Sequence, residues 1–222
     1  ARVRIFTPDH ELPFAGHPTL GTAYVLAQRQ GLSDVVLETK MGLVPVRFDA
    51  SGRGTMTQPV PTVRRMGDDE RAAVLAAIGV DRSLAPVDLY DNGVPHLYVV
   101  LESPDAVANL RPDLRAVEAA VGSAGVNCIA GGANVWKTRM FIPGAGVGED
   151  PATGSAAGPL AVHAARHGLA PWGEELTISQ GAEIGRPSTL YATAWGEGDR
   201  VDRVEVAGDC VIVGETTFTL PT

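Results

Sequence analysis

The chain has 222 residues, of which 45% are hydrophobic and 20% charged, as in a folded globular protein. Its 26 acidic and 18 basic residues give a net charge of -8, which argues against nucleic acid or an anionic membrane as the main partner. No apolar run approaches the roughly 20 residues of a membrane-spanning helix. The two cysteines, Cys128 and Cys210, form no CxxC pair or Cys/His cluster, so we expect no structural zinc site and a reducing, cytoplasmic location.

The first half of the chain is predicted to alternate short strands with two helices. Residues 1–7 already alternate polar and apolar side chains like a half-buried strand, with no leader before them. We expect a beginning in mid-fold, without the opening strands; removal of the initiator Met or of a disordered leader is the alternative. A helix is expected over 18–30, because proline favours a first helical turn and glycine follows the last one. An acidic run predicts a second helix over 68–78. The strands expected here are 35–39, 43–48, 54–58, 87–90 and 96–101.

The second half shows the same mixture, with no linker before it. Helices are expected over 113–121 and 152–167, and strands over 126–129, 136–141, 176–179, 188–195, 201–206 and 210–220. Many short strands with few helices predict an α+β protein. With a boundary near Ala85, we expect a first domain of residues 1–84 plus about 210–222, and a second domain of residues 85–209.

An internal repeat indicates that the two halves are duplicated. The run HPTLGTA, from His17, parallels the run DPATGSA, from Asp150. Each run opens a predicted helix that ends in Gly-Leu, and strands follow both helices. We therefore expect two similar α+β domains that face each other.

Each of these runs carries a side chain that can exchange protons, His17 or Asp150, just before a proline. At a helix N-cap the backbone N–H groups are unpaired and the dipole is positive, so two such ends facing one cleft would hold a small carboxylate. That arrangement suits proton abstraction and return without a cofactor. Asp150 alone could be a simple cap, but His is a poor capping residue, and the paired runs together favour function. The pattern by itself leaves the reaction open.

The other histidines have simpler explanations. His96 begins a predicted strand, and we expect a structural role for it, although the turn before it could border the cleft. His163 and His167 have the i, i+4 spacing of metal ligands. Since no third ligand is evident in the sequence, we expect them on a solvated face or at a helix C-terminus, and we expect no metal.

Two longer runs are similar to the signatures of the phenazine biosynthesis isomerase-like (PhzF-type) family. They are ELPFAGHPT, from Glu11, and GEDPATGSA, from Gly148. Shorter matches are RIFT from Arg4, RMF from Arg139, ISQG from Ile178 and GRPS from Gly185. The resemblance implies the diaminopimelate epimerase-like fold, in which two pseudo-symmetric domains each curl a mostly antiparallel sheet around a central helix.

The same resemblance implies a homodimeric, cofactor-independent isomerase that moves a proton on a small substrate bearing a carboxylate and an amine. It makes His17 and Asp150 the proton-handling residues and places the active site between the domains. It makes Gly16, Gly154 and Ser155 contacts to the substrate, with Ser155 at its carboxylate.

Two features depart from the family pattern. The related epimerases use a pair of cysteines, and Ala15 and Thr153 stand at those places, which disfavours a two-thiol racemase. The glutamate regarded as the family's main base belongs to a segment that would precede residue 1, and a separate N-terminal fragment could supply it as a partner. Glu215, in GETTF, is a weak substitute that we expect in a turn. The alternatives are therefore a catalytically inactive small-molecule-binding protein of the same fold, or an epimerase or racemase.

Overall fold

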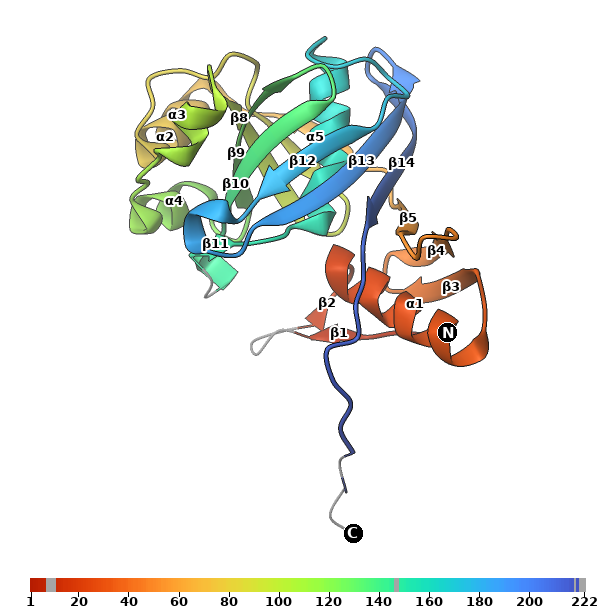
Figure 1. Cartoon of the computed structure of the whole chain (residues 1–222). Coiled ribbons are helices and arrows are strands. Elements are labelled where there is room, and N and C mark those ends of the chain that lie inside the picture. The colour runs from red at the N-terminus through yellow and green to blue at the C-terminus, as the bar shows by residue number, and fades with distance from the viewer. Residues whose placement is uncertain (7–10, 146–147, 218, 220–222) are drawn as a thin grey trace.

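A computed structural model describes residues 1–6, 11–145, 148–217 and 219. Within this part of the chain, β1 and β2 form a small hairpin and the other strands form one twelve-stranded sheet (Figure 1). The strands are β1 (Ile5–Phe6), β2 (Glu11–Leu12), β3 (Asp34–Thr39), β4 (Gly42–Phe48), β5 (Gly54–Gln58), β6 (Thr62–Arg65), β7 (Asp88–Asp91), β8 (Pro95–Val100), β9 (Gly125–Gly132), β10 (Val135–Phe141), β11 (Glu149–Asp150), β12 (Leu176–Gln180), β13 (Ser188–Glu197) and β14 (Arg200–Gly208).

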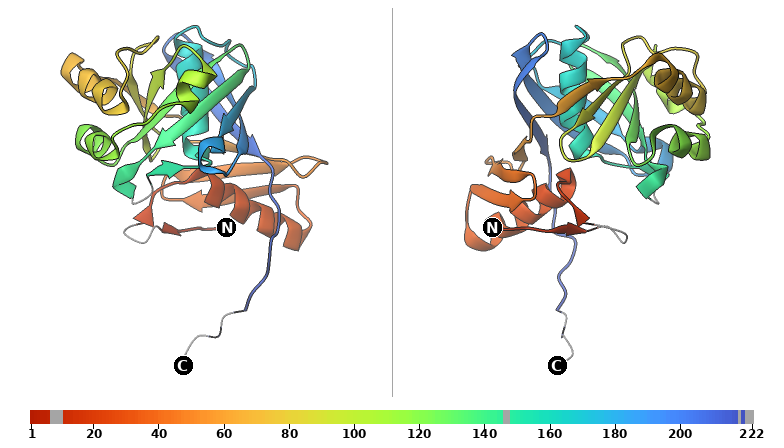
Figure 2. Two further views of the ribbon diagram at one scale, coloured as in Figure 1. Left: turned by 60° about the vertical axis from the view of Figure 1, so that its left-hand side comes forward. Right: turned by 180° about the vertical axis from the view of Figure 1, so that it is seen from behind.

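Five α-helices accompany these strands in the described residues. They are α1 (Gly16–Gln30), α2 (Asp68–Ile78), α3 (Pro104–Ala108), α4 (Leu114–Val121) and α5 (Gly154–Arg166). In Figures 1 and 2, α1 lies with β3–β5 in the lower part of the molecule, whereas α2, α3 and α4 gather beside β8 and β9.

The large sheet curls around α5, which runs behind β12 and β13 in Figure 1. Its order is β3-β4-β5-β14-β13-β12-β10-β9-β8-β7-β6, with β11 attached to β10. Neighbouring strands are antiparallel except for the parallel pairs β8–β9 and β10–β12. The pairing of β5 with β14, in which Met56 lies opposite Val206, joins the strands around α1 to those around α5.

Two apolar clusters support this arrangement. One collects buried side chains from both α1 and α5 together with β3–β5 and β12–β14, and includes Leu20, Met56 and Leu160. The other lies where α2, α3 and α4 cover β8 and β9, and includes Ile78 and Val117. The first cluster gives α1 and α5 a common core, so their relative position is fixed by packing.

The structure confirms the α+β class and most expected elements, with several corrections. Helix α1 starts at Gly16 and not at Pro18, which is its third residue, and α5 starts at Gly154. The sequence did not predict β6 or α3. Thr7 of the RIFT match, and residues 218 and 220 of the last expected strand, lie outside the described residues.

The expected strand over 210–220 is wrong for residues 210–217 and 219. This stretch has no strand partner among the described residues, and Val211 and Val213 are 79% and 96% exposed. Alternating side chains form a strand only where a neighbouring strand takes up the backbone hydrogen bonds. In the part of the chain that the structure describes, no helix has both the length and the apolar character needed to cross a membrane.

Candidate active site

The N-terminal ends of α1 and α5 touch through two glycines. A Cβ atom built on Gly16 would lie 2.6 Å from the carbonyl carbon of Gly154 and 2.7 Å from the backbone nitrogen of Ser155. Both neighbours are backbone atoms that cannot rotate away, so any side chain at position 16 would force the two helix starts apart. The two paired sequence runs therefore meet at their first helical residues.

Among the described residues, no side chain caps either helix start. Ala15, the N-cap of α1, has an extended backbone (φ -153°, ψ 137°), and Thr153, the N-cap of α5, makes no capping hydrogen bond with its side chain. The first-turn N–H groups of a helix and the positive end of its dipole attract anions. Two such ends in contact form one electropositive spot that suits a small carboxylate.

The sequence predicted Asp150 at a helix N-cap, and this is wrong. Asp150 ends strand β11, three residues before Thr153, which is the N-cap of α5. Its Oδ2 accepts a hydrogen bond of 2.5 Å from the Thr153 hydroxyl. Gln180 holds this turn by donating from Nε2 to the Asp150 carbonyl (2.7 Å) and to Thr153 Oγ1 (2.8 Å). Its Oε1 accepts from the Thr153 backbone N–H at 3.1 Å. Gln180 thus fixes the carboxylate of Asp150 relative to the start of α5.

A nearly buried ion pair anchors the strand that carries Asp150. Arg139 of β10 donates from Nε and Nη2 to the two carboxylate oxygens of Glu149, at 2.9 and 2.7 Å. The guanidinium also donates to the carbonyl oxygens of Ala108 and Leu110. A bidentate pair with further hydrogen bonds has a defined geometry, so β11 is held against β10.

A cavity of about 150 Å³ lies at the contact between the two helices. Its polar wall is formed by His17, Asp150 and Ser155, together with Gly16 and Gly154. The apolar wall of this cavity is formed by Leu12, Val94, Met140 and Ile142. A second hollow of about 420 Å³ also has Gly16, His17 and Gly154 in its lining, so the helix contact borders both spaces.

The structure thus brings together all five residues expected at the site: Gly16, His17, Asp150, Gly154 and Ser155. His17 is exposed and is the second residue of α1, not its N-cap. The N-caps Ala15 and Thr153 border the cavity, and neither Cys128 nor Cys210 lines it. Glu215 lies beside Arg29, near the opposite end of α1.

His96 also borders the cavity, although the sequence predicted a structural role for it and only the turn before it as a possible border of the cleft. It is fully buried in β8, and its Nε2 lies 3.1 Å from Ser155 Oγ. Burial lowers its pKa to about 3, so the ring is neutral at physiological pH. A neutral imidazole can orient the Ser155 hydroxyl toward a ligand.

The first turn of α5 is held by side chains from two strands and from the turn between β7 and β8. Pro159 lacks an N–H group, so it cannot donate to the carbonyl of Ser155, four residues earlier. Asn92 replaces this bond, with its Nδ2 donating to that carbonyl at 2.9 Å. The neighbouring carbonyls of Gly154 and Ala156 accept from Gln58 Nε2 (2.7 Å) and the Tyr98 hydroxyl (2.6 Å).

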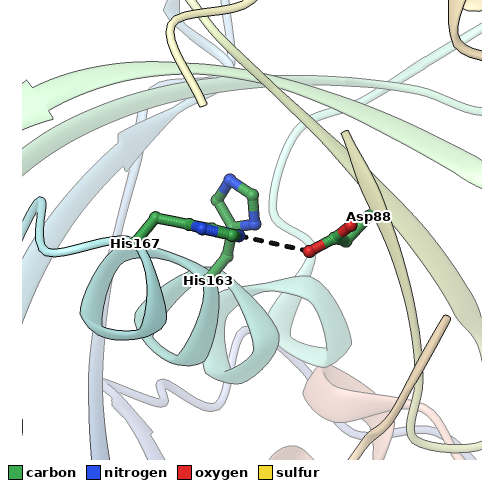
Figure 3. Close-up of side chains that lie close together, drawn as sticks. All are labelled: Asp88, His163 and His167. Atoms are coloured by element: carbon green, nitrogen blue, oxygen red, sulfur yellow. Dashed lines mark hydrogen bonds and ion pairs between the residues drawn. The ribbon is translucent and has the colours of Figure 1, made fainter. Parts of the chain in front are cut away.

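A second group of titratable side chains lies at the other end of α5. His163 and His167 face Asp88 of β7 (Figure 3), and one ligand atom from each of the three lies within 4.8 Å of the others. His163 is fully buried in the last turn of α5, so of the two expected positions the solvated face is wrong and the helix C-terminus is confirmed. Desolvation lowers the pKa of His163 well below its usual range and keeps the ring neutral.

Comparison with known proteins gives a consistent result. Residues 1–216 match the family described as phenazine biosynthesis-like protein. A trans-2,3-dihydro-3-hydroxyanthranilate isomerase from Pseudomonas aeruginosa is 48% identical over 213 residues, which cover 94% of this chain and 76% of that protein. The enzyme with the same name from Pseudomonas fluorescens is 46% identical over 224 residues, covering 99% and 80%.

Solved structures agree with the sequence comparison. A Bacillus anthracis phenazine biosynthesis protein of the PhzF family superimposes with a TM-score of 0.75 at 26% identity, covering 94% of this chain and 77% of that one. A predicted epimerase from Pseudomonas aeruginosa gives a TM-score of 0.73 at 29% identity, covering 94% and 75%.

Proposed function

Since the chain belongs to the phenazine biosynthesis-like (PhzF) family of isomerases and has its diaminopimelate epimerase-like fold, we propose that it moves a proton between carbon atoms of a small cyclic amino acid. The relatives named above act on trans-2,3-dihydro-3-hydroxyanthranilate, and we propose this compound or a close analogue as the substrate. The reaction that we propose needs no cofactor.

The observation that carries the proposal is the contact between Gly16 and Gly154, which joins two uncapped helix starts beside Asp150. The helix starts and the Ser155 hydroxyl, oriented by His96, suit the substrate carboxylate. The apolar wall around Met140 suits a hydrocarbon ring. This division of the cavity matches a molecule that is charged at one end and apolar at the other.

In the proposed reaction one C–H bond breaks and its electron pair is delocalised over the conjugated ring. A new C–H bond then forms at another carbon, so no oxidant or reductant is consumed. His17, His96 and Asp150 are the described cavity residues whose side chains can exchange protons at moderate pH, and the low pKa of His96 keeps that ring neutral. We therefore assign proton transfer to Asp150, whose Oδ2 is held by Thr153, with His17 as a second proton-handling group.

The test is hydrogen exchange in D2O. The protein is incubated with trans-2,3-dihydro-3-hydroxyanthranilate, and deuterium in the recovered compound and product is measured by mass spectrometry. We expect uptake and isomerisation by the wild type, loss of both in Asp150→Asn, and no change in Asp69→Asn, which alters an exposed carboxylate of α2. Substrate binding without exchange in the wild type would instead support the inactive binding protein.

We also propose that the cavity lies between a domain formed by residues 1–84 with about 210–222 and a domain formed by residues 85–209, and that two copies form a homodimer. Light scattering coupled to gel filtration tests the dimer. We expect a particle with twice the mass of one chain. A monomer mass at micromolar concentration would contradict it. Since both glycines of the helix contact belong to one chain, the proposed chemistry does not depend on this result.

A further inference from the structure

The C-terminal end of α5 brings a possible set of metal ligands together, as Figure 3 shows. His167 Nε2 lies 3.2 Å from Asp88 Oδ2. Two ligands that each lie about 2 Å from a tetrahedral zinc ion are roughly 3.3 Å apart, so this pair already has the separation of two ligands on one ion. His163, one helical turn before His167, supplies the third side chain.

The two ring nitrogens of His163 have different surroundings. Nδ1 lies 3.1 Å from the Tyr90 hydroxyl, whereas Nε2 is buried and has no hydrogen-bond partner among the described residues. In Figure 3 the ring nitrogen on the side of Asp88 is the one beside the ring's attachment to the chain, which is Nδ1. Nδ1 is therefore the atom that would bind the ion, in place of its contact with the Tyr90 hydroxyl.

The Asp88 and Asp199 carboxylates are compensated by nearby guanidinium groups. Arg166 Nη1 lies 3.5 Å from Asp88 Oδ2, and its Nη2 pairs with Asp199 of the turn between β13 and β14. Arg65 also lies near the Asp199 carboxylate. The histidines also lie at the C-terminal end of α5, where the helix dipole favours positive charge.

We propose that Asp88, His163 and His167 bind a divalent ion of the zinc class, which fastens the end of α5 to β7. Two imidazoles and a carboxylate are a ligand set that zinc accepts, with water in the fourth position. Asp88 and His163 are buried, and the partly exposed side chain of His167 gives access from solvent. The 13 residues of α5 separate this site from the active-site cavity by about 20 Å, so the inference stands apart from the proposed function.

Zinc titration of the full chain, by calorimetry and by competition with a coloured chelator, tests the site. We expect one zinc ion per chain, with affinity reduced by at least about tenfold in His167→Gln and in Asp88→Asn. His17→Gln removes a distant histidine and Cys210→Ser removes the more exposed thiol, and both should bind zinc like the wild type. Equal binding by His167→Gln and the wild type, or no saturable binding at all, would overturn the proposal.

Three further measurements separate a metal site from a purely structural cluster. In Arg166→Gln a competing positive charge is removed, so zinc affinity should rise, whereas damage to the local structure would lower it. Cobalt should give visible absorption typical of nitrogen and oxygen ligands, without the intense near-ultraviolet bands of thiolate. Zinc should also raise the melting temperature of the wild type by a few degrees but not that of His167→Gln, which shows whether this variant is folded. Loss of zinc binding in Arg166→Gln, or a thiolate spectrum, would contradict the proposed ligands.

Discussion

The two helices that open with the paired runs have very different surroundings. Every residue of α5 from Gly154 to Ala165 is buried, whereas α1 buries only Gly16, Thr19, Leu20, Ala23 and Ala27. The sheet encloses α5, and β3–β5 cover one face of α1. The two helices nevertheless contribute equivalent groups to the cavity. The site therefore depends on where the helices meet, and stability depends mainly on the enclosed helix.

The largest effect should follow from closing the helix contact. Gly16→Ala places a methyl group against the backbone of Gly154, which should cost about 1–3 kcal/mol of unfolding free energy and abolish isomerase activity. Gly21→Ala, in the same helix, meets no atom of the described residues within 4 Å and should stabilise α1 by up to about 1 kcal/mol. Urea unfolding and activity assays measure both. Similar behaviour of the two variants would show that the contact does not define the site.

The second prediction concerns the hydrogen bond by which Asn92 compensates for the N–H group that Pro159 lacks in α5. Asn92→Ala leaves the Ser155 carbonyl without its donor and should cost about 1–3 kcal/mol. Adding Pro159→Ala restores a backbone N–H four residues after Ser155, so the double variant should recover part of this loss. Urea unfolding of both single variants and the double variant measures the coupling. Strict additivity would contradict the compensation between Asn92 and Pro159.

Acid should weaken the region around α5 before that around α1. His96 and His163 have folded-state pKa values below that of a free imidazole because both are buried. The unfolded chain therefore binds more protons than the folded chain. The free energy of unfolding that these histidines contribute above about pH 6.5 is lost as the pH is lowered toward 3. Each histidine should contribute a slope of up to about 1.4 kcal/mol per pH unit. Unfolding measured from pH 7 to 5 should show a shallower slope in His96→Gln, and an unchanged slope would refute this assignment.

The smallest effect is expected on the exposed side of α1. Glu215 lies 3.9 Å from Arg29, and both side chains are largely exposed, so Glu215→Gln should leave stability and activity unchanged. Isomerase assays on this variant, beside Asp150→Asn, measure the difference. A loss of activity in Glu215→Gln would assign to this glutamate the catalytic role that its position disfavours.

Local signals in the sequence located the elements and the paired runs well. The acidic start and the glycine stop placed α2 at its observed bounds, and the repeat identified the two helix starts that meet. The partners that position the site were not predicted, because Gln180 and His96 reach it from distant strands. Likewise, Asp88 is 79 positions from His167, so no local spacing could have indicated the third ligand. The strand expected over 210–220 failed because alternation does not reveal whether a neighbouring strand exists.

The contact between Gly16 and Gly154 also has a consequence for engineering the protein. A Cβ atom on Gly154 would lie 3.3 Å from Gly16 Cα, so each position limits the other. Glycine is already the smallest residue, so enlarging one position cannot be offset by shrinking the other. Variant libraries that reshape the cavity should therefore keep both glycines and vary the apolar wall. A larger side chain at one of the positions Leu12, Val94 and Ile142 can be combined with a smaller one at another.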